Sequence, residues 1–458
     1  ILGLTCSGTP GADVPDQTFT ADFPDPAGRA VTIEDYYRNN SIGGPSISPN
    51  GQWVSFSYSY PDEENNNSRS ENWLVPADGS AEPRRLTSQN SNSSRARWTE
   101  DGFLMYTVQR ETWYLDVEKP NSRPFQDSNR NNTANYSPDK KWIAETRNTP
   151  VSEHNKSFAS DFIKRHEERF EGIQFDWMNF QRDGRDMPIP DSRDPSINPP
   201  SEIYISPADG GEAKQLTNLE LRPSGVTWRP DGEELVFTAD SHYRDEMTYG
   251  RSDLWTVTVE GEVTRITDDG FTYGSTGYSP DGKYLSYSRG YGTDMVIADR
   301  MDNGGPRDLF VMLANGGTPV NLTDTWDLSP GSPRWSPDSQ FIYFTAGIGG
   351  STHLFRVSSD GGEVEQVTTG ERRLGSLTID KDFKSMAYTV GRIEGPSEIY
   401  TANIDGSNER QITEMGKDFT TEITFSKAER LLFASYDGTP IEGWILYPYG
   451  YNPENGPY

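Results

Sequence analysis

The feature that most constrains the fold is a short turn motif that recurs along the chain. Its clearest copy, Ser279-Pro280-Asp281-Gly282, is followed by a strand-like run of aromatic and small residues at 283–287. Proline presets φ for a turn, the aspartate side chain can bond nearby backbone, and glycine accepts a positive φ. Six further copies, some of them degenerate, begin at Ser48, Thr99, Ser137, Arg229, Ser336 and Asp380. A repeat of this kind has to be interpreted before any other feature.

Each repeat also has a closing signature, an aliphatic residue followed by threonine. Examples are Leu216-Thr217, Leu322-Thr323 and Ile412-Thr413. Four antiparallel strands repeated at roughly 40–50 residues are typical of a β-propeller blade. The sequence therefore predicts an all-β, seven-bladed β-propeller of four-stranded antiparallel blades over residues 32–420. The expected blades lie at about 46–90, 95–127, 134–217, 225–268, 276–323, 333–368 and 376–413.

Three segments fall outside this pattern. Residues 1–31 form a polar, Pro-containing stretch that we expect to be a flexible N-terminal segment. The third repeat carries a long insertion, 151–200, which begins with a helical pattern at 161–170. Long excursions from a regular scaffold often have a function. Residues 421–458 have a strand, a turn and a strand without the closing signature, so we expect them to leave the propeller.

Composition excludes several classes of function. The net charge of −28 disfavours binding to nucleic acid and to anionic membranes. One cysteine, Cys6, excludes an internal disulfide and a cysteine zinc site, and the four histidines show no metal-binding spacing. We find no Gly-x-Ser-x-Gly nucleophile motif, no phosphate-binding loop and no other cofactor motif, so no cofactor is expected. On its own residues the chain is predicted to be a scaffold or a binding module.

The first residues of the chain suggest where the protein resides in the cell. The sequence before Cys6 resembles the end of a bacterial lipoprotein signal, although Gly3 and Thr5 depart from the usual pattern and no charged leader is present. This interpretation makes Cys6 a lipid-attachment site in an exported protein, periplasmic or anchored to the outer membrane. The alternative is a free thiol in an unstructured terminus.

Two resemblances sharpen the prediction. The repeats resemble TolB-type propeller blades, which name no activity. The stretch 433–453, FASYDGTPIEGWILYPYGYNP, resembles the crossing from the propeller to the α/β-hydrolase domain in the prolyl oligopeptidase family of serine peptidases. The resemblance implies that the chain ends at the start of an α/β-hydrolase domain whose Ser-Asp-His triad is absent. It therefore implies a serine peptidase parent, whereas these 458 residues alone would carry no catalytic residue.

The same resemblance suggests substrate-binding residues. Glu167 and Glu168 resemble the paired glutamates with which dipeptidyl peptidases of the family hold a substrate's α-amino group, a task suited to two carboxylates. The alternative is a solvated helix face on which Lys164 pairs with Glu168. Arg110, in the second repeat, is similarly placed to an arginine that binds a substrate carbonyl in those enzymes. The alternative for Arg110 is an ordinary surface hairpin.

The leading hypothesis is a propeller that gates access of short peptides to a serine peptidase domain missing from this chain. That hydrolase domain and peptide substrates are the expected partners, with membrane attachment by lipid alone and self-association left open. The alternative is a stand-alone TolB-like propeller that serves as a protein–protein interaction or structural module.

Overall fold

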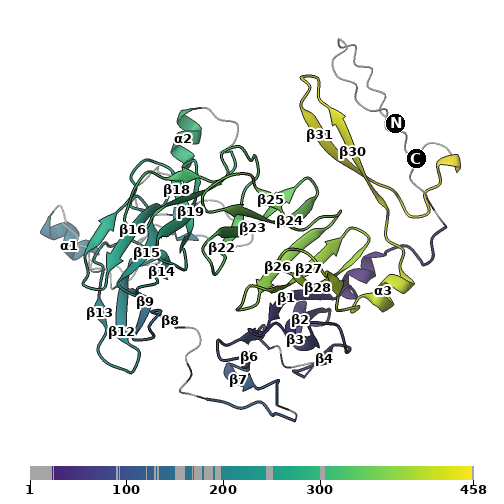
Figure 1. Cartoon of the computed structure of the whole chain (residues 1–458), viewed down its shortest axis with the longest axis horizontal. Helices are drawn as coiled ribbons and strands as arrows, with labels where there is room; N and C mark the ends of the chain where they lie inside the picture. Colours follow the sequence, from purple (N-terminus) through teal and green to yellow (C-terminus); the bar gives the residue numbers. More distant parts are fainter. Residues whose placement is uncertain are drawn as a thin grey trace. The chain divides into compact units, whose positions relative to one another are not determined.

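The structure is a computed structural model that consists mostly of β-strands (Figure 1). It describes residues 23, 25–88, 91, 93–119, 121–127, 130, 134–149, 160–167, 169, 178–179, 189–190, 198–243, 251–299 and 305–455. The described residues form two compact units. Unit 1 takes its residues from 1–130, 347–355 and 366–458, and unit 2 from 131–346 and 356–365.

The recurring turn folds as its residues predict. In the copy at 279–282, the Ser279 hydroxyl accepts the Tyr284 N–H at 2.9 Å and donates to the Asp281 carboxylate at 2.6 Å. Asp281 accepts the Lys283 N–H at 3.1 Å, and Gly282 has a φ of +72°. Bonds from Ser279 and Lys283 lower the pKa of Asp281 to about 2. All of these contacts are local, so each copy can start its strand independently of the rest of the chain.

The first two sheets of unit 1 come from its N-terminal part. The 3-10 helix η1 (Ile33–Tyr37) precedes an antiparallel sheet in the order β1-β2-β3-β4. The strands of this sheet are β1 (Ser41–Ile47), β2 (Trp53–Asp62), β3 (Asn67–Pro76) and β4 (Arg84–Arg85). A second sheet has three strands, β5 (Arg97–Trp98), β6 (Leu104–Val108) and β7 (Glu111–Leu115).

The C-terminal part of unit 1 supplies another antiparallel set, against which β1 packs. Its strands are β26 (Arg373–Ile379), β27 (Ser385–Arg392), β28 (Gly395–Asn403) and β29 (Arg410–Gln411). Helix α3 (Lys417–Glu422) follows, and then a two-stranded antiparallel sheet of β30 (Ala428–Ala434) and β31 (Pro440–Leu446), and the 3-10 helix η2 (Pro453–Asn455).

Unit 2 contains three four-stranded antiparallel sheets. The first joins β8 (Asn135–Tyr136), β9 (Trp142–Asn148), β12 (Ser201–Pro207) and β13 (Lys214–Gln215). The second joins β14 (Ser224–Trp228), β15 (Glu234–Ala239), β16 (Asp253–Thr258) and β17 (Val263–Arg265). The third joins β18 (Thr272–Tyr278), β19 (Tyr284–Gly290), β20 (Asp308–Leu313) and β21 (Val320–Asn321).

The remaining elements are short or divided between the units. The insertion contributes α1 (Asp161–Glu167), β10 (Met178–Asn179) and β11 (Ile189–Pro190), and α2 (Thr293–Ala298) follows β19. The sixth repeat supplies β22 (Gly331–Trp335), β23 (Phe341–Ile348), β24 (Ser351–Ser358) and β25 (Glu365–Gln366).

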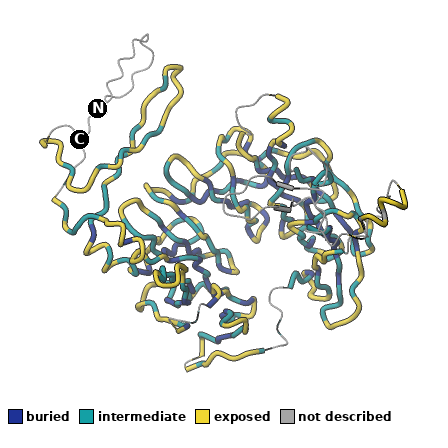
Figure 2. Tube along the Cα trace, turned by 180° about the vertical axis from the view of Figure 1, so that it is seen from behind, coloured by how far each residue is buried: buried dark blue, intermediate teal, exposed yellow. Residues whose placement is uncertain are grey.

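Each unit buries its own apolar side chains. In unit 1, Val54 and Phe56 of β2 pack with Ile399 of β28. In unit 2, Phe237 of β15 lies in a core that Ile203 also enters, and its ring stacks on Trp255 at 6.3 Å. Figure 2 shows the buried positions along the strands of both units, whereas β30 and β31 contain no buried residue. The repeats are therefore the source of the hydrophobic cores.

The predicted seven-bladed β-propeller of four-stranded antiparallel blades is wrong. Among the described residues the sheets form no closed ring, and their strands are divided between two units. The second sheet has three strands, and Thr352 of β24 joins Arg373 of β26 by a parallel bridge. The expected start of an α/β-hydrolase domain is a two-stranded antiparallel sheet. The turn motif specifies strands through local bonds, whereas ring closure needs contacts between sheets, which the motif does not encode.

The second sheet has no fourth strand among the described residues. Among its described residues, the segment after β7 pairs with β7 through a single bridge. There Tyr114 and Phe125 exchange backbone hydrogen bonds of 2.8 and 2.9 Å. Arg130 lies over the rings of Phe103 and Tyr114, at 4.4 and 5.4 Å from their centroids. Cation–π and ring contacts thus attach the described part of this segment to the sheet beside that bridge.

Candidate functional site

Arg110 lies in the two-residue turn between β6 and β7. Val108 pairs with Glu111 across the hairpin, so Gln109 and Arg110 alone make the turn. Their φ values are +52° and +72°, as a type I′ hairpin turn requires. Asn-Gly is the usual sequence for this turn, because other L-residues are strained by about 1–2 kcal/mol each in the left-handed region. Backbone strain of this kind is common at functional sites.

The Arg110 side chain is exposed, and it forms no hydrogen bond or ion pair with any described part of the chain. Beside its turn is an open groove of about 460 Å³ that both neighbours of Arg110, Gln109 and Glu111, line. The groove also contacts Tyr106, which is 5% exposed, and Trp113. Burial raises the pKa of Tyr106. The groove therefore has an aromatic wall and one cation in its lining, Arg123, whereas Arg110 belongs to the adjoining turn and does not line the groove.

The other predicted site residues are less fully described. Glu167 is the last residue of α1, while Glu168 and Cys6 lie outside the described residues. Arg110 belongs to unit 1 and α1 to unit 2. Substrate binding by Glu167 and Glu168, and lipid attachment at Cys6, stay predictions.

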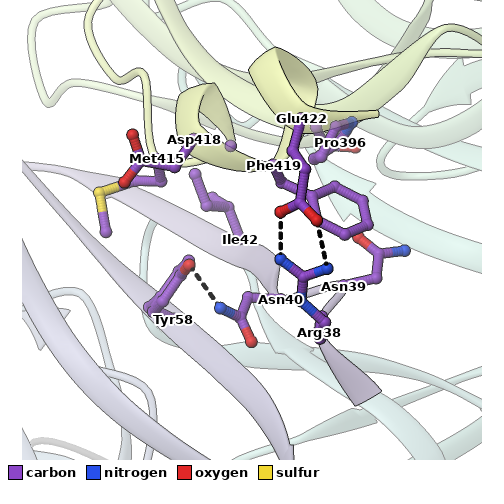
Figure 3. A pocket seen from close by; sticks show the side chains of 12 residues that line it. Arg38, Asn39, Asn40, Ile42, Tyr58, Pro396, Met415, Asp418, Phe419 and Glu422 are labelled. Atoms are coloured by element: carbon purple, nitrogen blue, oxygen red, sulfur yellow. Dashed lines mark hydrogen bonds and ion pairs between the residues drawn. The ribbon is translucent and has the colours of Figure 1, made fainter. Parts of the chain in front are cut away.

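A second cavity, of about 230 Å³, lies in unit 1 between the segment that precedes β2 and helix α3 (Figure 3). Figure 3 shows the Arg38 guanidinium facing the Glu422 carboxylate, while Asn40 donates to the Tyr58 hydroxyl at 2.9 Å. Burial raises the pKa of Tyr58. The Arg38 guanidinium also lies 6.0 Å from the centroid of the Phe419 ring. The charged groups of this cavity are largely paired with one another, which indicates a structural junction.

Asp35 is the centre of that junction. Its side chain is 2% exposed and accepts two 2.7 Å bonds from Arg29 and one of 3.0 Å from Arg38. It also accepts the Thr32 N–H at 2.8 Å. These bonds, led by those from Arg29, hold the pKa of Asp35 well below its usual range. Thr32 and Asp35 also form the capping box of η1, so Asp35 both caps this helix and binds Arg29.

The N-terminal segment is joined to the end of α3 through its backbone as well. Arg29 N–H donates to the Glu422 carbonyl, and Thr424 N–H donates to the Arg29 carbonyl, each at 2.9 Å. A Cβ on Gly28 would lie 2.4 Å from the Glu422 carbonyl oxygen, so only glycine fits there. Side-chain and backbone bonds together therefore connect segments at the two ends of unit 1.

Neither a metal site nor a membrane-spanning helix is found within the described ranges. No three or more His, Cys, Asp or Glu side chains there are grouped so that they could hold a metal ion. No helix among the described residues has the length and apolar character needed to cross a bilayer.

Comparisons with known proteins bear on function. No protein-family model matches the chain. Dipeptidyl-peptidase 5 of Porphyromonas gingivalis is 22% identical over 447 residues, which cover 92% of this chain and 61% of that protein. The uncharacterized peptidase YuxL of Bacillus subtilis is 24% identical over 341 residues, 54% of this chain and 51% of that protein.

A solved structure, an acylaminoacyl peptidase in complex with Z-Gly-Gly-Phe-chloromethyl ketone, has a similar fold. Its TM-score is 0.57 at 14% identity, with 90% of this chain and 58% of that chain covered. The chain thus spans about three-fifths of the first of these relatives and about half of the second. By sequence it is similar to proteins named as peptidases, and by fold to part of an acylaminoacyl peptidase.

Proposed function

We propose that this chain is the substrate-binding part of a serine peptidase of the prolyl oligopeptidase family that cleaves short peptides. The observation that carries the proposal is the similarity to dipeptidyl-peptidase 5 over 92% of the chain. The 458 residues contain no Gly-x-Ser-x-Gly motif. The proposal therefore places the nucleophile in sequence outside these residues.

The Arg110 turn supports a role in substrate binding. A hairpin that served stability alone would gain from Asn-Gly at Gln109-Arg110, because both positions have a positive φ. The strained arginine instead presents an exposed, unpaired guanidinium beside a groove with an aromatic wall. In the proposed enzyme it donates to a carbonyl oxygen of the bound peptide.

We also propose export of the protein, with Cys6 as a lipid-attachment site. The support is the resemblance of the residues around Cys6 to a lipoprotein signal. Metabolic labelling with an alkyne fatty acid tests this proposal, with Cys6→Ser as the matched control. Labelling that persists in Cys6→Ser, or that never occurs, overturns it.

The test of peptidase function compares the 458-residue chain with the product of the complete gene. We expect the complete product to release 4-nitroaniline from dipeptidyl substrates and to react with a fluorophosphonate probe, and the 458-residue chain to do neither. Stoichiometric labelling of the 458-residue chain, or no hydrolysis of any peptide by the complete product, contradicts the proposal. The second result would favour the stand-alone interaction module.

Arg110→Gly tests the role of the turn. The substitution relieves strain, so the free energy of unfolding should rise by about 1 kcal/mol. Loss of one charge-assisted hydrogen bond, worth about 1.5–3 kcal/mol, should lower kcat/KM of the complete enzyme about 10- to 100-fold.

The matched control is Gln109→Gly, which relieves the same kind of strain next to Arg110 and keeps the guanidinium. It should stabilise the protein without loss of activity. Equal activity losses in the two variants, or no loss in Arg110→Gly, would leave Arg110 as an ordinary hairpin residue.

A further inference from the structure

Unit 1 contains another groove, of about 420 Å³, which the turn before β24 and three further parts of the chain line. These three are the start of β26, the turn between β27 and β28, and the β30–β31 sheet. Arg373, Arg392 and Trp444 line it, one from each of these three parts. None of the site residues predicted from the sequence lines this groove.

Two guanidinium groups in the groove are available to a ligand. Arg373 donates from Nε to the Gly350 carbonyl at 3.4 Å, and Arg392 donates from Nη1 to the Tyr400 hydroxyl at 3.2 Å. Both residues are exposed, and neither forms an ion pair with a described residue. Since an arginine has five N–H donors, most donors of both groups are unused.

The two arginines that line the groove come from paired strands, one of which is irregular. Arg373 pairs with Gly391 across the β26–β27 ladder, and Arg392 is the residue that follows Gly391. Successive residues of a regular strand point to opposite faces. The β27–β28 register shifts between Val390 and Arg392, and bulges of this kind redirect side chains.

A third arginine forms a fixed part of the same groove. The Arg372 side chain is 9% exposed, and its Nη1 donates to Glu409 at 2.7 Å. Glu409 also accepts a bond from the Tyr388 hydroxyl. The Arg372 Nε is buried and has no hydrogen-bond partner among the described residues. The guanidinium is thus rigidly held, with its charge compensated on one side.

The other wall of the groove is an indole. Trp444 is 38% exposed, and its Nε1 donates to Glu442 at 2.8 Å. The same carboxylate accepts the Gly350 N–H at 2.7 Å and a 2.8 Å bond from Arg430. These bonds hold the indole in place, with Ile393 and Ala428 adding apolar surface.

Two exposed carboxylates, Glu371 and Glu394, also line the groove and restrict the ligand. They repel a phosphate dianion more strongly than a singly charged carboxylate. Planar guanidinium groups match a carboxylate in geometry as well as in charge. The arrangement therefore favours a monoanionic carboxylate joined to an apolar group.

We propose that this groove binds the C-terminal carboxylate of a short peptide whose last side chain is apolar. Arg373 and Arg392 bind the carboxylate, and the last side chain lies against Trp444. The proposal goes beyond peptide cleavage, because it concerns a second peptide-binding site. A peptide can bind there without any catalytic residue in the chain. Its test therefore needs no enzyme activity and can fail or succeed independently of the proposed function.

The test is calorimetric titration of the 458-residue chain with Ala-Ala-Phe and with its C-terminal amide. We expect the free acid to bind at least tenfold more tightly than the amide. Arg373→Gln and Arg392→Gln should each weaken binding of the acid about 10- to 100-fold, the range for one charge-assisted hydrogen bond. Trp444→Leu should reduce the preference for Ala-Ala-Phe over Ala-Ala-Gly.

Arg84→Gln is the matched control, because Arg84 is an exposed arginine of unit 1 on β4 that does not line this groove. It should leave binding unchanged. Arg373→Lys keeps the charge without the planar fork and should give an intermediate affinity, which guards against a misfolded glutamine variant. Equal binding of acid and amide, equal loss in Arg84→Gln, or tighter binding of inorganic phosphate than of the peptide would overturn the proposal.

Discussion

Arg38 and Glu422 are 384 positions apart in the sequence, yet their side chains form two hydrogen bonds, one of 3.0 Å between Nη1 and Oε1. Glu422 also accepts bonds of 2.9 and 3.1 Å from Arg29. The same two arginines bind Asp35, so two carboxylates and two guanidinium groups form one cluster. Unit 1 is thus held together at η1 and α3 by ionic contacts, in a region where little apolar surface is buried.

This cluster makes stability depend on pH. Bonds from Arg38 and then Arg29 lower the pKa of Glu422 from 4.5 to about 2. A carboxyl with a lowered folded-state pKa contributes stability above its unfolded pKa and loses that contribution as the pH falls toward the folded value. We expect Glu422→Gln to lower Tm at pH 7, and the difference from the wild type to shrink between pH 4.5 and 2.

Thermal denaturation from pH 7 to pH 2 measures this effect. Asp418→Asn is the control, since Asp418 is an exposed carboxylate of the same helix that forms no ion pair with a described residue. It should change Tm little at any pH. A Tm difference for Glu422→Gln that stays constant over the whole range would contradict the ionic origin of the effect.

The β30–β31 sheet depends on a glycine in the turn before β24. A Cβ on Gly350 would lie 2.6–2.8 Å from three atoms of the Trp444 indole. The Gly350 N–H also donates to Glu442 of β31. We therefore expect Gly350→Ala to displace β31 and to increase hydrogen–deuterium exchange in residues 428–446.

Gly347→Ala controls for the loss of a nearby glycine, since Gly347 lies near the end of β23, three positions before Gly350. A Cβ on Gly347 would meet its nearest neighbour, the Ser351 carbonyl oxygen, at 3.9 Å, which is ordinary contact. Exchange in 428–446 should be unchanged in this variant. Similar exchange in both variants would show that the contact between Gly350 and Trp444 does not hold the sheet in place.

Recognition of a substrate amino group by the insertion helix stays a prediction. If Glu167 and Glu168 bind the ammonium group, Glu167→Ala and Glu168→Ala should each lower kcat/KM of the complete enzyme about 10- to 100-fold on free-amine peptides. Matched N-acetylated peptides lack the cation, so their hydrolysis should be unaffected. Asp161→Ala, at the other end of α1, is the control. Equal losses on both kinds of peptide would leave the helix as a solvated surface.

Some of the site could be predicted from sequence. The residues around Arg110 indicate a hairpin, and the structure places it in a two-residue turn. The positive φ values could not be predicted, because Gln-Arg lacks the Asn-Gly signal for this turn. The groove lined by Arg373, Arg392 and Trp444 could not be predicted, since its residues come from strands that are separate in the sequence and the strand register shifts next to Arg392.

The features that can be predicted from the sequence are local. Ser279 bonds to residues two and five positions ahead, so the turn and the strand that follows it can be predicted from a few adjacent letters. The tertiary structure alone decided the division into two units, the three-stranded second sheet and the pairing of Arg38 with Glu422. These features depend on which sheets pack together and on which charged side chains the fold brings into contact. Contacts of that kind join residues hundreds of positions apart, and a repeated turn motif carries no information about them.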